Sequence, residues 1–358
     1  MNPVPVVPIE VRPAPLRVAV LLNRRARGVR PRQIERIARL HPTSDIFLSE
    51  DLEHCRAIAR VLVQRCYDRV LLGGGDGTFT RCLTELEREA RRQGAPLPTL
   101  GVLRLGTGNA LGLYLGASEP SERGLRADLL RAHTLGVGPT RGAPGSGGGL
   151  VKPLQVLRVA GQLATFAGTG LDSQILQDYG ATGRMLDNVG VGPFFSSPLR
   201  YALAVALRSL PRFLFRRLPQ VEVRNVGGPA YQIGPDGQPE STPLPAGTVL
   251  YRGPCTLAGA ATIPCYGFNV RIFPYADRLH GKFHLRCTDA SALETLAHLP
   301  AVLRGEYRSP SIRDFLCDAV ELHTDQPVPF QVGGDLLPDP GQTLRIELNE
   351  HIIPVLSA

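Results

Sequence analysis

Lysine is nearly absent from this sequence. Only Lys152 and Lys282 occur, and arginine makes up the other 38 of the 40 basic residues. Neither lysine stands in a Gly-x-x-x-x-Gly-Lys-Ser/Thr string, so a Walker-type phosphate loop is excluded. Any phosphate-binding site in this chain must therefore use backbone N–H groups, a bound cation or arginine.

Long apolar runs and cysteine pairs are also missing. No stretch of about 18 apolar residues is present, so no membrane-spanning helix is predicted. Seven cysteines are scattered without a Cys-x-x-Cys pair, which argues against a zinc site or a disulfide framework and for a reducing cytosol. The proline-rich start does not resemble a signal peptide, and we expect residues 1–15 to form a disordered tail. A cytoplasmic protein is predicted.

Length and charge allow two domains and several kinds of partner. The chain has 358 residues, of which 43% are hydrophobic and 20% charged, as in an ordinary globular protein. Its net charge of +8 permits attraction to nucleic acid, anionic lipid or phosphorylated ligands. No recognised nucleic-acid-binding motif is present, so nucleic acid is not predicted as a partner.

The first third alternates between strand and helix patterns. Together they predict a doubly wound, Rossmann-like α/β domain over residues 16–136, with its ligand at the carboxyl ends of the strands. The predicted strands are Leu16–Leu22, Asp45–Ser49, Val70–Leu72 and Pro98–Leu105, and the predicted helices include Pro31–Leu40 and Asp51–Cys66.

A glycine-rich loop follows the third of these strands. It reads Gly73-Gly74-Gly75-Asp76-Gly77-Thr78 and leads into a helical pattern. Glycines allow their N–H groups to form a concave anion-binding nest, and the helix N-terminus adds partial positive charge. A carboxylate inside such a nest is unusual unless a cation or a proton transfer requires it. A plain tight turn with a helix N-cap at Asp76 or Thr78 would also explain part of the pattern.

A second glycine loop, Gly106-Thr107-Gly108-Asn109, follows the strand that ends at Leu105. On its own a Gly-x-Gly string is weak evidence. A dinucleotide-binding loop would need an acid about 20 residues downstream at a strand end. Asp128 lies near that distance, but in a helical stretch. We expect this loop to lie opposite the first one and to close on phosphates.

The second half changes to short strands. Residues 137–149 form a Gly/Pro-rich linker, and residues 150–358 are predicted to fold as an antiparallel β-sandwich. A long polar hairpin tip is expected over Gly227–Gly247. The expected strands are Leu154–Val159, Leu163–Ala167, Pro219–Val226, Gly247–Thr256, Gly267–Phe273, Lys282–Thr288, Ala319–Thr324, Phe330–Val332 and Gln342–Leu348.

The string Gly-Gly-Asp-Gly-Thr is typical of a kinase superfamily that includes diacylglycerol, sphingosine and NAD kinases and phosphofructokinases. The chain resembles the lipid kinases with a diacylglycerol kinase catalytic domain, with motifs in the same order over about residues 16–355. This resemblance implies that ATP contacts a loop after the first strand and both glycine loops. The implied nucleotide-binding residues are Asn23, Gly73, Gly74, Gly75, Asp76, Gly77, Thr78, Gly106, Thr107 and Asn109.

The resemblance also implies roles for three aspartates. Asp335 aligns with the glutamate of the family's Asp-Gly-Glu, the base proposed to take the proton from the lipid hydroxyl. Asp76 is assigned to Mg²⁺ or to the acceptor hydroxyl. Asp172 falls in a Gly-x-Gly-x-Asp string whose acid faces the lipid head group, although a turn or N-cap role stays open. An arginine from residues 184–217 is expected to complete a phosphate clamp.

Four acidic positions of the family are replaced, by Arg81, Ala110, His280 and Gly333. The acid that corresponds to His280 helps to hold a structural magnesium ion in some family members, and His280 itself is most simply a surface or turn residue. Asp76 and Asp335 remain where phosphoryl transfer needs carboxylates, and we expect both to converge on the outermost phosphate of ATP.

The predicted function is that of an ATP-dependent lipid kinase using ATP and Mg²⁺, with diacylglycerol or a ceramide-like sphingoid lipid as the acceptor. A catalytically weak or inactive nucleotide- or lipid-binding sensor is the alternative. An NAD kinase is disfavoured because it should carry Asn-Glu where this chain has Asn109-Ala110. The basic and aromatic stretch 189–219 is either a surface for peripheral contact with an anionic membrane or a core helix. The sequence does not decide between a monomer and a homodimer.

Overall fold

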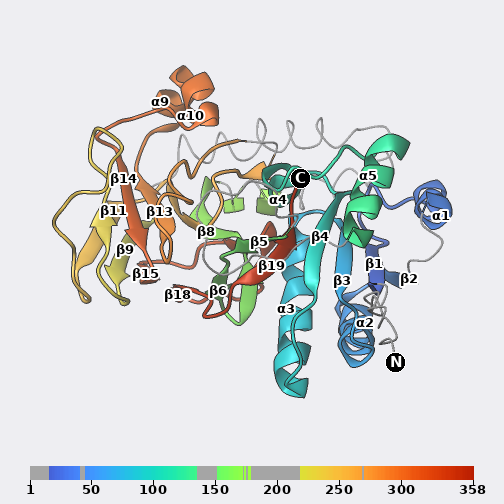
Figure 1. The fold of residues 1–358 in the computed structure, drawn as a ribbon. Coiled ribbons are helices and arrows are strands. Elements are labelled where there is room, and N and C mark those ends of the chain that lie inside the picture. The colour runs from blue at the N-terminus through green and yellow to red at the C-terminus, as the bar shows by residue number, and fades with distance from the viewer. Residues whose placement is uncertain are drawn as a thin grey trace, which may run out of the picture.

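A computed structural model describes residues 16–40, 45–134, 151–171, 173–174, 176–178, 218–267 and 270–358. These residues form three β-sheets, with helices packed against the first (Figure 1). The predicted tail, the predicted linker, Asp172 and the segment 184–217 lie outside the described residues.

The first sheet has the strand order β2-β1-β3-β4-β19-β5, with β5 antiparallel and the others parallel. The strand order reverses between β1 and β3, which is where a doubly wound sheet binds its ligands. The predicted α/β fold is therefore confirmed. The strands are β1 (Val18–Asn23), β2 (Asp45–Ser49), β3 (Arg69–Gly74), β4 (Thr99–Arg104), β5 (Val151–Leu154) and β19 (Ile353–Leu356).

Helices cover both faces of this sheet (Figure 1). In β1, Ala19 and Leu21 pack with α2 and α3, whereas Val20 and Leu22 pack with α1 and α5. Burial on both faces is the reason that β1 reads as a continuous apolar run. The helices are α1 (Pro31–Leu40), α2 (Leu52–Gln64), α3 (Asp76–Gln93), α4 (Ala110–Tyr114) and α5 (Glu122–His133).

The other two sheets form the predicted antiparallel sandwich. One has the order β10-β14-β13-β12-β8-β16-β17 and the other β11-β9-β15-β18-β6-β7, with an apolar core between them. The strands are β6 (Leu157–Val159), β7 (Gln162–Ala164), β8 (Phe166–Gly170), β9 (Gln220–Asn225), β10 (Tyr231–Gln232), β11 (Val249–Pro254), β12 (Leu257–Ala261), β13 (Phe283–Thr288), β14 (Ile312–Cys317), β15 (Ala319–Thr324), β16 (Phe330–Val332), β17 (Asp335–Leu336) and β18 (Thr343–Leu348). Two short helices, α9 (Ala292–Ala297) and α10 (Leu299–Arg304), connect β13 to β14.

One predicted strand is wrong, and several were missed. Among the described residues of 267–273, Val270 forms an isolated bridge with Tyr266 in place of a strand, and turns follow as far as residue 281. Buried aromatic rings hold this segment in place of a strand ladder: Phe273 and Tyr275 both contact the His284 ring edge-on. The missed β12 consists of Leu-Ala-Gly-Ala-Ala, which has little intrinsic strand preference.

The two halves of the chain share the first sheet. β19, at the C-terminal end, pairs with β4 through Val355 and Leu100, and β5 lies at the edge beside it. The side chain of Arg158 in the sandwich bonds Glu87 of α3 at 3.0 Å. The predicted boundary between the two domains, at residues 136–150, stays a prediction. The first sheet contains strands from both predicted domains.

All seven cysteines lie within the described residues and are free, six of them buried. Within the described chain, no helix is long and apolar enough to cross a membrane.

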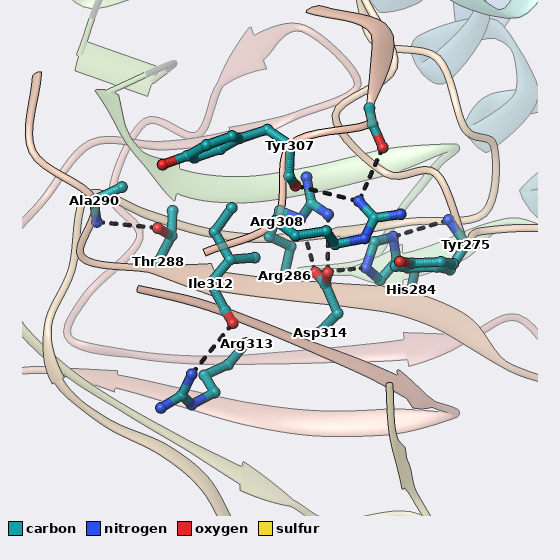
Figure 2. A network of polar contacts seen from close by, with 11 residues as sticks. Tyr275, His284, Arg286, Thr288, Ala290, Tyr307, Arg308, Ile312, Arg313 and Asp314 are labelled. Atoms are coloured by element: carbon teal, nitrogen blue, oxygen red, sulfur yellow. Dashed lines mark hydrogen bonds and ion pairs between the residues drawn. The ribbon is translucent and has the colours of Figure 1, made fainter. Parts of the chain in front are cut away.

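A buried ionic network joins β13 to β14 (Figure 2). Arg286 donates to both oxygens of Asp314, at 2.7 and 2.9 Å, and His284 Nε2 lies 2.9 Å from the same carboxylate. Burial lowers the pKa of His284, so Arg286 carries the positive charge of the network. Burial alone would raise the pKa of Asp314, but its cationic and hydrogen-bonding neighbours hold it well below its usual range.

We expect Asp314→Asn to lower the free energy of unfolding at pH 7 by about 3–5 kcal/mol, because Arg286 would stay buried without a counter-charge. The pKa of Asp314 is lower in the folded state, so its stabilising effect is present at neutral pH. That effect is lost as the pH falls below about 4, where the unfolded carboxylate takes up a proton.

Urea unfolding at several pH values measures this difference. Glu347→Gln, which removes an exposed ion pair with Arg345, serves as the control and should change stability by less than about 1 kcal/mol. A loss for Asp314→Asn no larger than that of the control would show that the network does not stabilise the fold.

Candidate active site

The carboxyl ends of β1, β3 and β4 meet at the strand-order reversal. Asn23, at the end of β1, donates from Nδ2 to Thr78 Oγ1 at 2.9 Å, which joins that strand to the first turn of α3. The Gly28 N–H donates to Leu105 O at 3.0 Å, at the end of β4. The predicted nucleotide residues that follow three separate strands are therefore neighbours in space.

The two glycine loops touch through their backbones. A Cβ atom on Gly106 would lie 2.1 Å from the Gly75 Cα atom, so this approach requires glycine. Asn109 closes the second loop on itself: its Oδ1 accepts from the Gly106 N–H at 3.0 Å and its Nδ2 donates to Gly106 O at 2.8 Å. Thr107 is exposed at the tip of the same loop. The loops face each other as predicted from their positions after neighbouring strands.

The N-terminus of α3 has the features of an anion-binding site. Gly75 is its N-cap and supplies no side-chain acceptor. The unpaired N–H groups of a first helical turn bind anions, and the dipole of this 18-residue helix adds to the attraction. The alternative of an N-cap at Asp76 or Thr78 does not hold, because the N-cap residue is Gly75.

Asp76 connects the two glycine loops. It begins α3, but its carboxylate accepts from the N–H groups of Ala110 and Leu111, each at 3.0 Å, and so caps the start of α4. Burial raises the pKa of Asp76, and these two N–H groups oppose that rise. The carboxylate therefore has a structural role between the loops, and its assignment to Mg²⁺ or to the acceptor hydroxyl stays a prediction.

A hairpin from the sandwich brings Asp335 to α3. Val332 pairs with Asp335 across a two-residue loop in which Gly333 and Gly334 have φ values of +57° and +88°, as in a type I′ turn. A Cβ atom on Gly333 would lie 1.8 Å from Thr80 Oγ1, so an acid does not fit at this position. A Cβ atom on Gly77 would lie 2.6 Å from Asp335 Oδ2, which places the carboxylate over the first turn of α3.

Arg81 is the charged neighbour of Asp335 that sequence reasoning missed. Its Nε atom lies 2.9 Å from Asp335 Oδ2, in an ion pair between side chains that are 49% and 34% exposed. Burial raises the pKa of Asp335, and the guanidinium opposes this rise. From the sequence alone, Arg81 is only a position at which an acid of the family is replaced. The spacing between Gly77 and Arg81 is the one available signal, since residues four apart share a helix face.

Asp76 and Asp335 thus reach the same helical turn and contact different partners. Asp76 is the first residue of α3 and bonds α4, whereas Asp335 lies against the second residue and pairs with Arg81. The distance between these carboxylates decides whether both act on one phosphate, and their roles stay predictions.

The described residues do not form a metal site of their own. Within the described chain, no three His, Cys, Asp or Glu side chains lie together as metal ligands. The two acids nearest the glycine loops are already engaged, Asp76 by backbone N–H groups and Asp335 by a guanidinium. His280, where the family has an acid, is an exposed turn residue. We therefore derive no step through a divalent ion.

A cavity of about 550 Å³ opens in the sandwich. Its size is in the range of small-molecule sites. Leu336 and Leu337, which directly follow Asp335, form part of the wall, and Leu171 and Val328 add apolar surface. Residues of β8, just before the predicted substrate residue Asp172, also line it.

Comparisons with known proteins agree with this geometry. Residues 17–137 match the diacylglycerol kinase catalytic domain family. No curated protein matches the sequence. A diacylglycerol kinase from Bacillus anthracis strain Sterne has a similar structure, with a TM-score of 0.56 and 15% identity over 97% of this chain and 98% of that chain. A second structure from that organism, proposed to be a diacylglycerol kinase, has a TM-score of 0.60 and 16% identity over 97% and 99%.

At such identities the structural likeness shows the fold alone, an α/β domain followed by a β-rich domain. The family match identifies the N-terminal part more closely. Residues 17–137 thus match the diacylglycerol kinase catalytic domain, and the resemblance seen in the motifs is confirmed.

The contact between the glycine loops can be tested with Gly106→Ala. The new methyl group would meet the Gly75 backbone, and we expect a loss of about 1–3 kcal/mol in the free energy of unfolding together with weaker ATP binding. Gly267→Ala is the control for stability, since among the described residues its Cβ atom would meet the Gly108 Cα atom at an ordinary contact distance of 3.6 Å. Thermal unfolding and calorimetry measure both effects. Equal behaviour of the two variants would contradict the close backbone contact.

Proposed function

We propose that the protein is an ATP-dependent lipid kinase that transfers the γ-phosphate of ATP to a hydroxyl group of diacylglycerol or of a ceramide-like sphingoid lipid. The observation that carries this proposal is that a carboxylate from the sandwich lies against the first turn of a helix whose N-cap residue has no side chain. Gly77, in the first turn of α3, lies directly under Asp335.

The N–H groups at the start of α3 and in the loop from Gly106 to Asn109 would hold the phosphates of ATP. Asn23 supports this cradle through its hydrogen bond to Thr78. Such fixed donors stabilise the negative charge on the transferred group without having to reorganise during the reaction. Because the chain has no Walker lysine, these backbone groups would bind the phosphates together with arginine or a bound cation.

Asp335 is the proposed base. As the lipid oxygen forms its bond to the γ-phosphorus, the hydroxyl proton passes to the Asp335 carboxylate. The bond between the γ-phosphorus and the bridging oxygen breaks, and ADP leaves with that electron pair. The cavity beside Leu336 would hold the apolar part of the acceptor, which brings its hydroxyl group toward Asp335. Delivery of the lipid requires peripheral contact with a membrane, which we propose on the same basis.

We expect Asp335→Asn to reduce kcat by about 10²–10⁴-fold, the contribution of a general base, with little change in ATP affinity. Transfer of labelled phosphate from ATP to diacylglycerol and to ceramide, in the presence of magnesium, measures it. Asp236→Asn is the control, because Asp236 is exposed and the Gln238 N–H that donates to its carboxylate can equally donate to an amide oxygen. Full activity in Asp335→Asn would remove Asp335 as the base.

Filling the cavity tests the acceptor site. Val328→Trp should raise KM for the lipid about tenfold, equivalent to leaving two CH₂ groups in water, and should leave ATP binding unchanged. Leu130→Trp, at a position 54% exposed on α5, is the control. An unchanged lipid KM for Val328→Trp would place the acceptor elsewhere.

A nucleotide- or lipid-binding sensor is the second candidate. The observation in its favour is that both acids already have partners, Asp76 two N–H groups and Asp335 a guanidinium. This candidate requires ATP binding by calorimetry and no turnover on any lipid of an array. Turnover on one lipid that is lost in Asp335→Asn would eliminate it.

A further inference from the structure

One face of α3 is occupied by the hairpin that carries Asp335. Three positions on that face, at spacings of three and four residues, make the contact: Gly77 and Arg81 with Asp335, and Thr80 with Gly333. Because Gly77 and Gly333 lack side chains, the carboxylate and the turn can approach the helix directly. Arg81 supplies the one long side chain at this contact.

Stability does not explain the ion pair. The Arg81 side chain is 49% exposed and that of Asp335 34% exposed, and pairs exposed to this extent contribute at most about 1 kcal/mol. The Oδ2 atom of Asp335 is buried, yet it receives no hydrogen bond of good geometry from the described residues. The ion pair is therefore the main favourable interaction available to this oxygen.

Arg81 is also the charged group that faces Asp335 within the described chain. From β16 the nearest polar side chain is Gln331, which is neutral and donates to Tyr266. On α3, the carboxylate of Asp76 is directed to the N–H groups of α4. The electrostatic state of Asp335 therefore depends on Arg81 and on the N-terminus of α3.

We propose that Arg81 is a positioning residue for phosphoryl transfer, whose guanidinium keeps the carboxylate of Asp335 ionised and aimed over the first turn of α3. The proposal rests on the kinase function proposed above. A base must be ionised before the hydroxyl proton reaches it, and burial works against this state. The cation four residues after Gly77 offsets the effect of burial.

Arg81→Gln tests the proposal without relying on turnover. Carboxyl NMR of the full-length protein labelled with ¹³C at aspartate gives the pKa of Asp335, and the signal is identified by its loss in Asp335→Asn. We expect Arg81→Gln to raise this pKa by about one unit. Arg92→Gln, which removes an ion pair with Glu89 farther along the same helix, should leave it unchanged.

The pH dependence of kcat gives the second measurement. With a higher pKa the base is protonated over a wider range, so the acid limb of the profile should move to higher pH by the same amount as the NMR value. At a pH on that limb, Arg81→Gln should lose about tenfold in kcat relative to wild type. Arg81→Lys should keep the pKa near that of wild type and lose part of kcat, because lysine lacks the planar fork that orients a carboxylate.

The measured pKa tests the role of Arg81, and turnover on lipid tests the kinase function, so the two proposals can fail separately. An Asp335 pKa that is the same in Arg81→Gln and wild type overturns the positioning role, whether or not the protein is a kinase. The same holds if Arg81→Lys shifts the pKa as much as Arg81→Gln, and the lysine variant carries the test if the glutamine variant does not fold. A shifted pKa in a protein that phosphorylates no lipid overturns the kinase function and leaves the electrostatic pairing established.

Discussion

The backbone contact between Gly75 and Gly106 is the constraint on which the site depends. The two glycine loops follow neighbouring parallel strands, and they can touch because neither carries a side chain at the point of contact. Asp76 then reaches across and bonds the N–H groups at the start of α4. A phosphate-binding surface without lysine becomes feasible because two sets of backbone N–H groups are held at one fixed separation.

The second constraint is the hairpin from the sandwich. Its turn needs two glycines with positive φ, and Gly333 also leaves room for Thr80 of α3. A short, defined turn places Asp335 against α3 more firmly than a long loop would. The C-terminal strand β19, which pairs with β4 in the first sheet, adds a further connection between the halves. The site is thus built across the chain, from residues more than 250 positions apart.

The structure shows the contacts made at several positions where an acid of the family is replaced. Gly333 is required by its contact with Thr80, and Arg81 forms an ion pair with the remaining acid, Asp335. The N–H group of Ala110 donates to Asp76, a bond that any residue other than proline would permit at that position. From the sequence alone, each of these changes is the loss of an acidic side chain. In the structure, two of them belong to one contact surface on α3.

Sequence patterns determined the architecture and the location of the site. Burial on both faces of parallel strands produces continuous apolar runs, and glycine strings after two of them located both loops. Tertiary structure alone decided the partners of the acids and the course of residues 270–282. These depend on contacts between residues far apart in the chain, such as Arg81 with Asp335 and Tyr275 with His284, and side-chain packing leaves no local periodicity from which they could be read.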